Sequence, residues 1–132
     1  MLENTIKNIV APLLLRLALA AVFLYHGVAL VSQEMGFGWN PGLPRVVQAL
    51  VAWGQLLGGA AMVIGFLTRL AAAGLIVIMV GAIALVHWPY GFSLPKGYEY
   101  NVVLILICLV LVLTGPGKLA VDHWLRLRLQ KG

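Results

Sequence analysis

Four long apolar runs, which carry almost no charge, make up most of this chain. They cover about residues 9–32, 46–67, 70–88 and 99–115. At 1.5 Å per residue, runs of about this length cross a hydrocarbon core of roughly 30 Å as helices. Only 10% of the chain is charged and 62% is hydrophobic, whereas soluble domains are about a quarter charged. We therefore predict an all-α protein, an integral membrane four-helix bundle forming a single transmembrane domain over residues 1–132.

Short polar segments between the runs set the predicted topology. Residues 33–45 are rich in Gly and Pro and forbid a regular helix. Residues 65–69 are too few for anything but a tight turn, so the second and third helices form an antiparallel hairpin. The purely apolar part of the fourth run, 102–114, is too short to span the core, and we extend this helix back to Glu99, which then lies at the interface.

The fourth helix is predicted to end at Gly115-Pro116-Gly117, because glycine favours helix termination and proline cannot continue the helix. The tail, 118–132, mixes leucines with basic residues. We expect it to lie in the plane of the lipid headgroups as an interfacial segment.

The basic residues predict the orientation of the bundle. With four spans, both termini and the 65–69 turn share one side of the membrane. That side collects seven of the nine basic residues, and the opposite side holds two, Arg45 and Lys96. Because Lys and Arg accumulate on the cytoplasmic side, both termini are predicted to be cytoplasmic.

Small residues on the second helix predict close helix packing. Gly54, Gly58 and Gly59 allow two helix backbones to approach closely in lipid. Such spacing serves either packing within one subunit or a dimer contact, and we favour the former.

A few polar side chains gather toward the outer ends of the predicted helices. His26, His87 and Glu99 come from three helices, Gln55 lies near mid-membrane, and Tyr98 precedes the fourth helix. Ionisable groups in spans usually face the bundle interior, where they pair or line a path. One interpretation is a polar pocket that handles protons or contacts a quinone; the other is that Glu99 and a histidine pair to tie helices together.

Arg16 lies one to two turns inside the cytoplasmic face of the first helix. Its side chain can reach the headgroups, pair with Asp122, or bind carbonyl groups freed at the Gly115-Pro116-Gly117 break. We favour a structural role for Arg16 and Asp122.

Several other classes of function and site lack support in the sequence. The basic residues lie at segment ends and not along one polar face, so nucleic acid is not an expected partner. One cysteine, Cys108, and three scattered histidines give neither an internal disulfide nor metal-ligand spacing. The first apolar run is long and contains Arg16, which does not suggest a cleavable signal peptide.

Five segments of the chain, in order, resemble the DoxX family. They are Leu14-Leu15-Arg16-Leu17 with Tyr25-His26-Gly27, Gly58-Gly59 followed by Gly65-Phe66-Leu67-Thr68-Arg69, His87-Trp88-Pro89-Tyr90-Gly91-Phe92, Gly97-Tyr98-Glu99-Tyr100, and Gly115-Pro116-Gly117-Lys118-Leu119 through Asp122. The resemblance implies a small four-helix protein of a bacterial or archaeal cytoplasmic membrane. The family takes its name from a subunit of an archaeal thiosulfate:quinone oxidoreductase, and other members are linked to membrane redox or thiol-stress complexes.

The resemblance suggests an integral membrane subunit of a quinone-linked redox system, which would act as an oxidoreductase only with protein partners. No cofactor is encoded in the chain, and a membrane quinone is the candidate ligand. Family members often carry a glutamate at the position of Gln55 and a lysine at that of Leu30, so this chain departs from them at both. The alternative is a non-catalytic accessory subunit packed into a larger membrane complex. A transporter is the least favoured interpretation, because no inverted repeat is visible.

Overall fold

The computed structural model describes residues 1–93 and 95–131, and all regular structure in that part of the chain is helical. Three segments, residues 2–31, 45–64 and 68–90, are long and apolar enough to cross a membrane, and Glu99–Thr114 is a shorter apolar helix. The predicted fold class, an all-α bundle of membrane helices, is confirmed.

The first membrane segment is one continuous helical rod. It consists of α1 (Leu2–Thr5), η1 (Ile6–Val10) and α2 (Ala11–Val31), and so begins well before residue 9. Pro12 in its first α2 turn has no N–H to donate back to the carbonyl group of Asn8. That carbonyl accepts a hydrogen bond from the Lys118 N–H instead (2.8 Å), which fastens the C-terminal segment to the first helix.

The remaining helices alternate in direction along the bundle. A short turn, η2 (Glu34–Gly36), lies in the loop before α3 (Arg45–Ile64), and α4 (Thr68–Ala82) continues through η3 (Ile83–His87) and η4 (Trp88–Tyr90). After α5 (Glu99–Thr114) the chain turns into α6 (Val121–Leu129). Gly65 and Gly115, which terminate α3 and α5, have φ angles of 70° and 88°, values that glycine adopts without strain.

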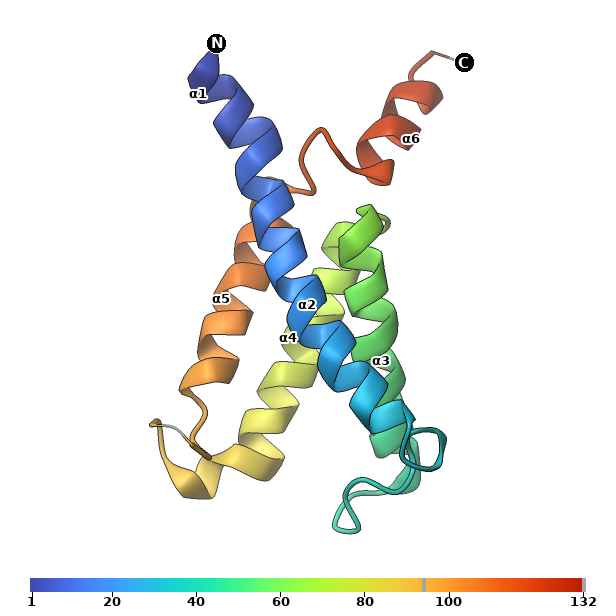
Figure 1. Cartoon of the computed structure of the whole chain (residues 1–132), viewed down its shortest axis with the longest axis vertical. Helices are drawn as coiled ribbons and strands as arrows, with labels where there is room; N and C mark the ends of the chain where they lie inside the picture. The colour runs from blue at the N-terminus through green and yellow to red at the C-terminus, as the bar shows by residue number, and fades with distance from the viewer. Residues whose placement is uncertain (94, 132) are drawn as a thin grey trace.

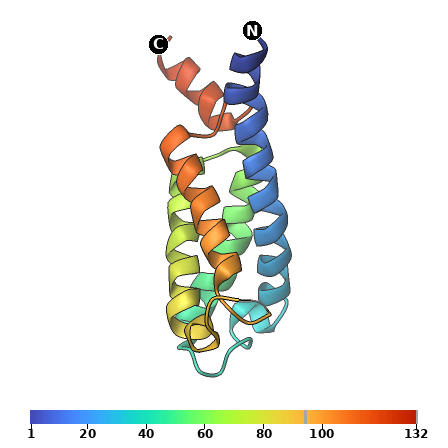
Figure 2. The ribbon, with the colours of Figure 1, turned by 90° about the vertical axis from the view of Figure 1, so that its left-hand side faces the viewer.

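The four long helices form two pairs, α2 with α3 and α4 with α5. The pairs lie close together near the end that carries both termini and diverge toward the other end (Figure 1). Seen from the side, α1 and α6 project beyond the bundle at the terminal end (Figure 2). The loop between α2 and α3 and the connection between α4 and α5 therefore lie together at the divergent end.

The helices pack through small residues and a buried apolar core. A Cβ atom added to Gly27 would lie 2.5 Å from the Leu56 backbone N, and one added to Gly59 would lie 2.8 Å from the Leu24 backbone N. Gly54 and Gly58 face Ile78 and Leu75 of α4. These glycines thus pack helices within the subunit. The core itself comprises Leu19, Ala20, Phe23, Met62, Ala72, Leu75, Met79, Leu104, Cys108 and Leu111.

Candidate functional site

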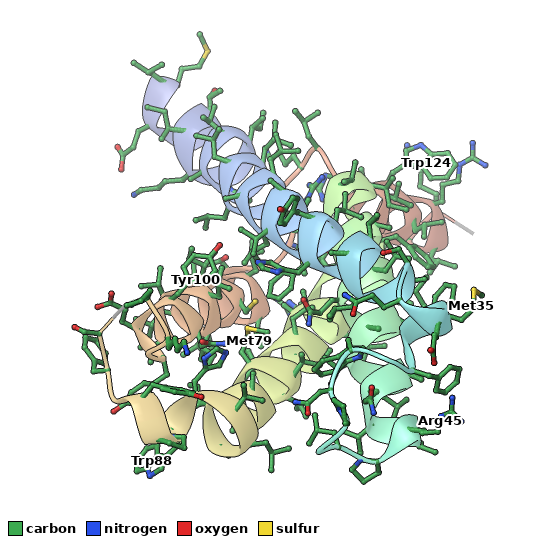
Figure 3. All side chains as sticks on the ribbon, turned by 60° about the horizontal axis from the view of Figure 1, so that its bottom comes forward. Met35, Arg45, Met79, Trp88, Tyr100 and Trp124 are labelled. Atoms are coloured by element: carbon green, nitrogen blue, oxygen red, sulfur yellow. The ribbon has the colours of Figure 1, made fainter. Side chains whose placement is uncertain are left out.

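A cavity of about 490 Å³ lies between the two helix pairs. Residues from α2, α3, α4, η3 and α5 line it, together with both loops at the divergent end. Most lining side chains are apolar. The exceptions are two histidines, two carboxamides, one phenol and one indole, namely His26, His87, Gln55, Asn101, Tyr100 and Trp39. Figure 3, which brings this end forward, shows Tyr100 of α5 and Met79 of α4, both of them lining residues.

The two histidines reach the cavity from opposite helix pairs. His26 on α2 is exposed and packs edge-to-face with Tyr25 (5.4 Å between ring centres). His87 ends η3, and its Nδ1 lies 2.9 Å from the carbonyl oxygen of Lys96. A carbonyl group only accepts, so Nδ1 carries the hydrogen, and in the neutral ring Nε2 is the acceptor nitrogen. His87 is thus held in one tautomer by the backbone.

Two carboxamides lie deeper than the histidines. Gln55 on α3 and Asn101 on α5 are each only 7% exposed. The Asn101 amino group donates to the Met79 sulfur at 3.4 Å, a weak acceptor. The side chain of Gln55 has no hydrogen-bond partner among the residues that the structure describes. Polar groups that a bundle buries without partners are costly, which makes them candidates for ligand contact.

The loop between α2 and α3 closes one side of the cavity and is held by Gln48. This buried side chain accepts from the Asn40 N–H (3.2 Å) and donates to the Leu43 carbonyl (2.8 Å). Its backbone carbonyl accepts from the Trp39 indole N–H (3.1 Å). Trp39 and Leu43, both lining residues, are therefore fixed by one residue at the start of α3.

Tyr98 and Glu99, two further predicted site residues, are not among the lining residues. Tyr98 stacks on Trp88 with ring centres 5.7 Å apart and packs edge-on against Phe92. Glu99 begins α5, and its N–H donates to the Phe92 carbonyl (2.8 Å). Both residues thus fasten the connection between α4 and α5, close to His87 in sequence but outside the cavity wall.

Arg16 lies at the terminal end of the bundle, away from the cavity, and is 2% exposed. Its guanidinium donates to four backbone carbonyl groups: Met62 (2.9 Å) and Val63 (3.0 Å) at the end of α3, and Pro116 (3.0 Å) and Leu119 (2.6 Å) after α5. Carbonyls at the C-terminus of a helix lack intrahelical partners. Arg16 therefore satisfies acceptors from two segments at once.

Asp122 binds a different set of groups. Its carboxylate accepts from the N–H groups of Leu67 (2.7 Å), the residue before α4, and Thr68 (2.8 Å), the first residue of α4, and its own N–H donates to the Gly65 carbonyl (2.9 Å). A carboxylate at a helix N-terminus satisfies free amides and interacts favourably with the helix dipole. Asp122 thus attaches α6 to the turn between α3 and α4.

Asn101 is the lining residue that sequence reasoning missed as a site candidate. The buried positions of α5 are Asn101, Leu104, Cys108 and Leu111, which follow helical spacing. A polar residue in register with that buried stripe was the signal that could have identified it. Within the described residues, no group of three or more His, Cys, Asp or Glu side chains could hold a metal ion.

Comparison with known proteins gives two matches. The DoxX family model matches residues 11–88, the part that contains Arg16, His26, Gln55 and His87. A Bacillus subtilis (strain 168) protein named "Putative oxidoreductase CatD" is 29% identical over 116 residues, which cover 86% of this chain and 85% of that protein. No solved structure matches the chain.

Proposed function

The chain belongs to the DoxX family, and on that premise we propose that it is an integral membrane subunit of a quinone-linked redox system. The observation that carries the proposal is the cavity, which has an apolar lining and brings His26 and His87 together with two buried carboxamides. Ligand pockets commonly combine an apolar lining with a few placed polar groups. The name of the Bacillus subtilis relative supports a redox role.

The chemistry of the lining suits a quinone head group. A quinone has two carbonyl groups that need hydrogen-bond donors, and its reduction to a quinol takes up two electrons and two protons. Histidine exchanges protons near neutral pH, and the tautomer of His87 leaves its Nε2 as the acceptor. In this proposal a partner protein that carries a redox cofactor exchanges the electrons, and the histidines exchange the protons.

The proposed location is the cytoplasmic membrane, with both termini in the cytoplasm. Both termini lie at one end of the bundle (Figure 1), and most basic residues belong to that end. The positive-inside rule then places the cavity in the outer leaflet. A quinone could enter it from the lipid phase without crossing the bilayer.

Replacing His87 by Ala tests the proposal. We expect quinone-dependent electron transfer in membranes from the native host to fall by at least about tenfold, because general acid–base groups commonly contribute more than that. His123→Ala is the control, since His123 lies in α6 outside the cavity. Immunoblots of the membrane fraction measure the amount of both variants.

Unchanged electron transfer in the His87→Ala variant, at unchanged protein level, would contradict the quinone proposal. If the substitution instead released partner proteins on gentle purification, the alternative would be favoured, that of a non-catalytic accessory subunit in a larger membrane complex.

A further inference from the structure

We infer that Gln55 and Asn101 are the ligand-recognising residues of the cavity, and that they select an uncharged head group that can both accept and donate hydrogen bonds. The assignment of a quinone and its quinol to this class rests on the proposed function. The assignment of the two residues rests on their burial and their unused hydrogen-bonding groups.

Both carboxamides are more than nine-tenths buried, and both line the cavity. Gln55 has no hydrogen-bond partner in the described part of the chain, and Asn101 has only a weak one, the Met79 sulfur. A buried amide without partners destabilises a fold unless something else satisfies it. Since Gln55 has no partner and Asn101 uses only one N–H on a weak acceptor, a bound molecule is the partner for which this arrangement is suited.

The lining favours uncharged head groups. No Lys, Arg, Asp or Glu side chain is among the described lining residues. A fatty-acid carboxylate or a lipid phosphate placed there would lose its hydration and meet no permanently charged cation, only the imidazoles of His26 and His87, and the loss of hydration is costly. The cavity is therefore matched to a neutral lipophile.

A carboxamide suits a head group that changes between carbonyl and hydroxyl. It carries two N–H donors and a carbonyl acceptor, so it can donate to a quinone oxygen and accept from a quinol hydroxyl without changing its own charge. Gln55 comes from α3 and Asn101 from α5, one from each helix pair. A head group bound by both would bridge the two helix pairs, which diverge toward the end opposite the termini (Figure 1).

The test measures binding to the purified full chain by native mass spectrometry after release from detergent micelles. The probes are decylubiquinone, which is neutral, and laurate, which is an anion with a similar alkyl chain. Two variants replace the amides by apolar side chains of similar shape, Gln55→Met and Asn101→Leu. Gln33→Met is the matched control, because Gln33 lies outside the lining.

We expect one decylubiquinone per chain, at least about tenfold weaker binding of laurate, and a loss of about tenfold in decylubiquinone affinity for each cavity variant. The Gln33→Met control should bind as the wild type does. Equal affinity in the wild type and both cavity variants would overturn the assignment of Gln55 and Asn101 while leaving the cavity as a quinone site.

The wild-type comparison of the two probes does not depend on any variant folding. Laurate binding as tightly as decylubiquinone would overturn the selection for uncharged head groups. If the wild type bound no decylubiquinone, the proposed function itself would fail, and the assignment of the two amides would fail with it.

Discussion

At the scale of single residues, Arg16 shows how backbone carbonyl groups can stabilise a charged side chain inside a membrane helix. Its four hydrogen bonds go to carbonyl groups from two segments of the chain, 46 to 103 positions away in sequence. The fork of guanidinium donors makes this geometry available, whereas a lysine ammonium is a compact point charge. Arg16 therefore connects α2, the end of α3 and the segment after α5.

Arg16→Met should lower the free energy of unfolding by at least about 3 kcal/mol, because it leaves four buried or part-buried carbonyl groups without their charged donor. Arg16→Lys should retain part of that stability. The change is measured by chemical unfolding in mixed detergent micelles. Arg69→Met is the control: Arg69 lies at the same end but is exposed, with one long hydrogen bond to Leu113 (3.5 Å). A loss as large for Arg69→Met as for Arg16→Met would contradict this role.

The sequence identified Arg16 and Asp122 as structural charges but could not choose their partners. The hydrogen bonds in the structure join Arg16 to carbonyl groups and Asp122 to the amides of Leu67 and Thr68. Backbone groups carry no residue-specific signal in the sequence. The carbonyl groups and amides in question lack intrahelical partners only because α3 and α5 end, and α4 begins, at these positions. The choice therefore depends on the assembled end of the bundle.

At the scale of helices, close approach between α2 and α3 depends on glycine. Gly27→Ala should destabilise the protein by about 1–3 kcal/mol, because the new Cβ would lie 2.5 Å from the backbone N of Leu56 and force the two helices apart. Gly74→Ala is the matched control, since a Cβ there meets nothing within 4 Å. It should be neutral, or stabilising by up to about 1 kcal/mol, because alanine favours helix more than glycine.

Thermal unfolding of both variants in the same detergent distinguishes them. Similar melting temperatures for Gly27→Ala and Gly74→Ala would mean that α2 can shift away from α3 at little cost, contrary to the packing in the structure.

The existence of the helices could be predicted from sequence because apolar length and glycine-proline breaks are local signals. The residues at which the helices begin and end were harder to predict from the sequence. The first helix extends back to Leu2, where Glu3 and Lys7 form an exposed ion pair one turn apart (2.6 Å), and Pro12 is tolerated within it because the carbonyl group of Asn8 accepts from Lys118 instead. The tail forms a helix, α6, although its alternation of leucine and arginine gives no clear helical stripe.

At the scale of the whole molecule, the cavity depends on how the two helix pairs diverge. Helical rise fixes the depth of each residue in the membrane, so the sequence could place His26 and His87 toward one end and Gln55 near mid-membrane. It could not fix the rotation of each helix about its axis. In the structure that rotation directs Asn101 to the cavity, while Tyr98 and Glu99 lie in the connection before it.

The orientation of the bundle determines the leaflet in which the cavity lies, and therefore which pool of ligand the cavity can reach. Cys108 is fully buried, so it gives little background in labelling by a membrane-impermeant maleimide. Pro41→Cys places an exposed thiol in the loop between α2 and α3, and Gln130→Cys places one after α6. In intact cells only Pro41→Cys should react, whereas both variants should react after the membrane is permeabilised. Labelling of Gln130→Cys in intact cells would place the termini outside and the cavity in the inner leaflet, because both termini lie at the end opposite the cavity (Figure 1).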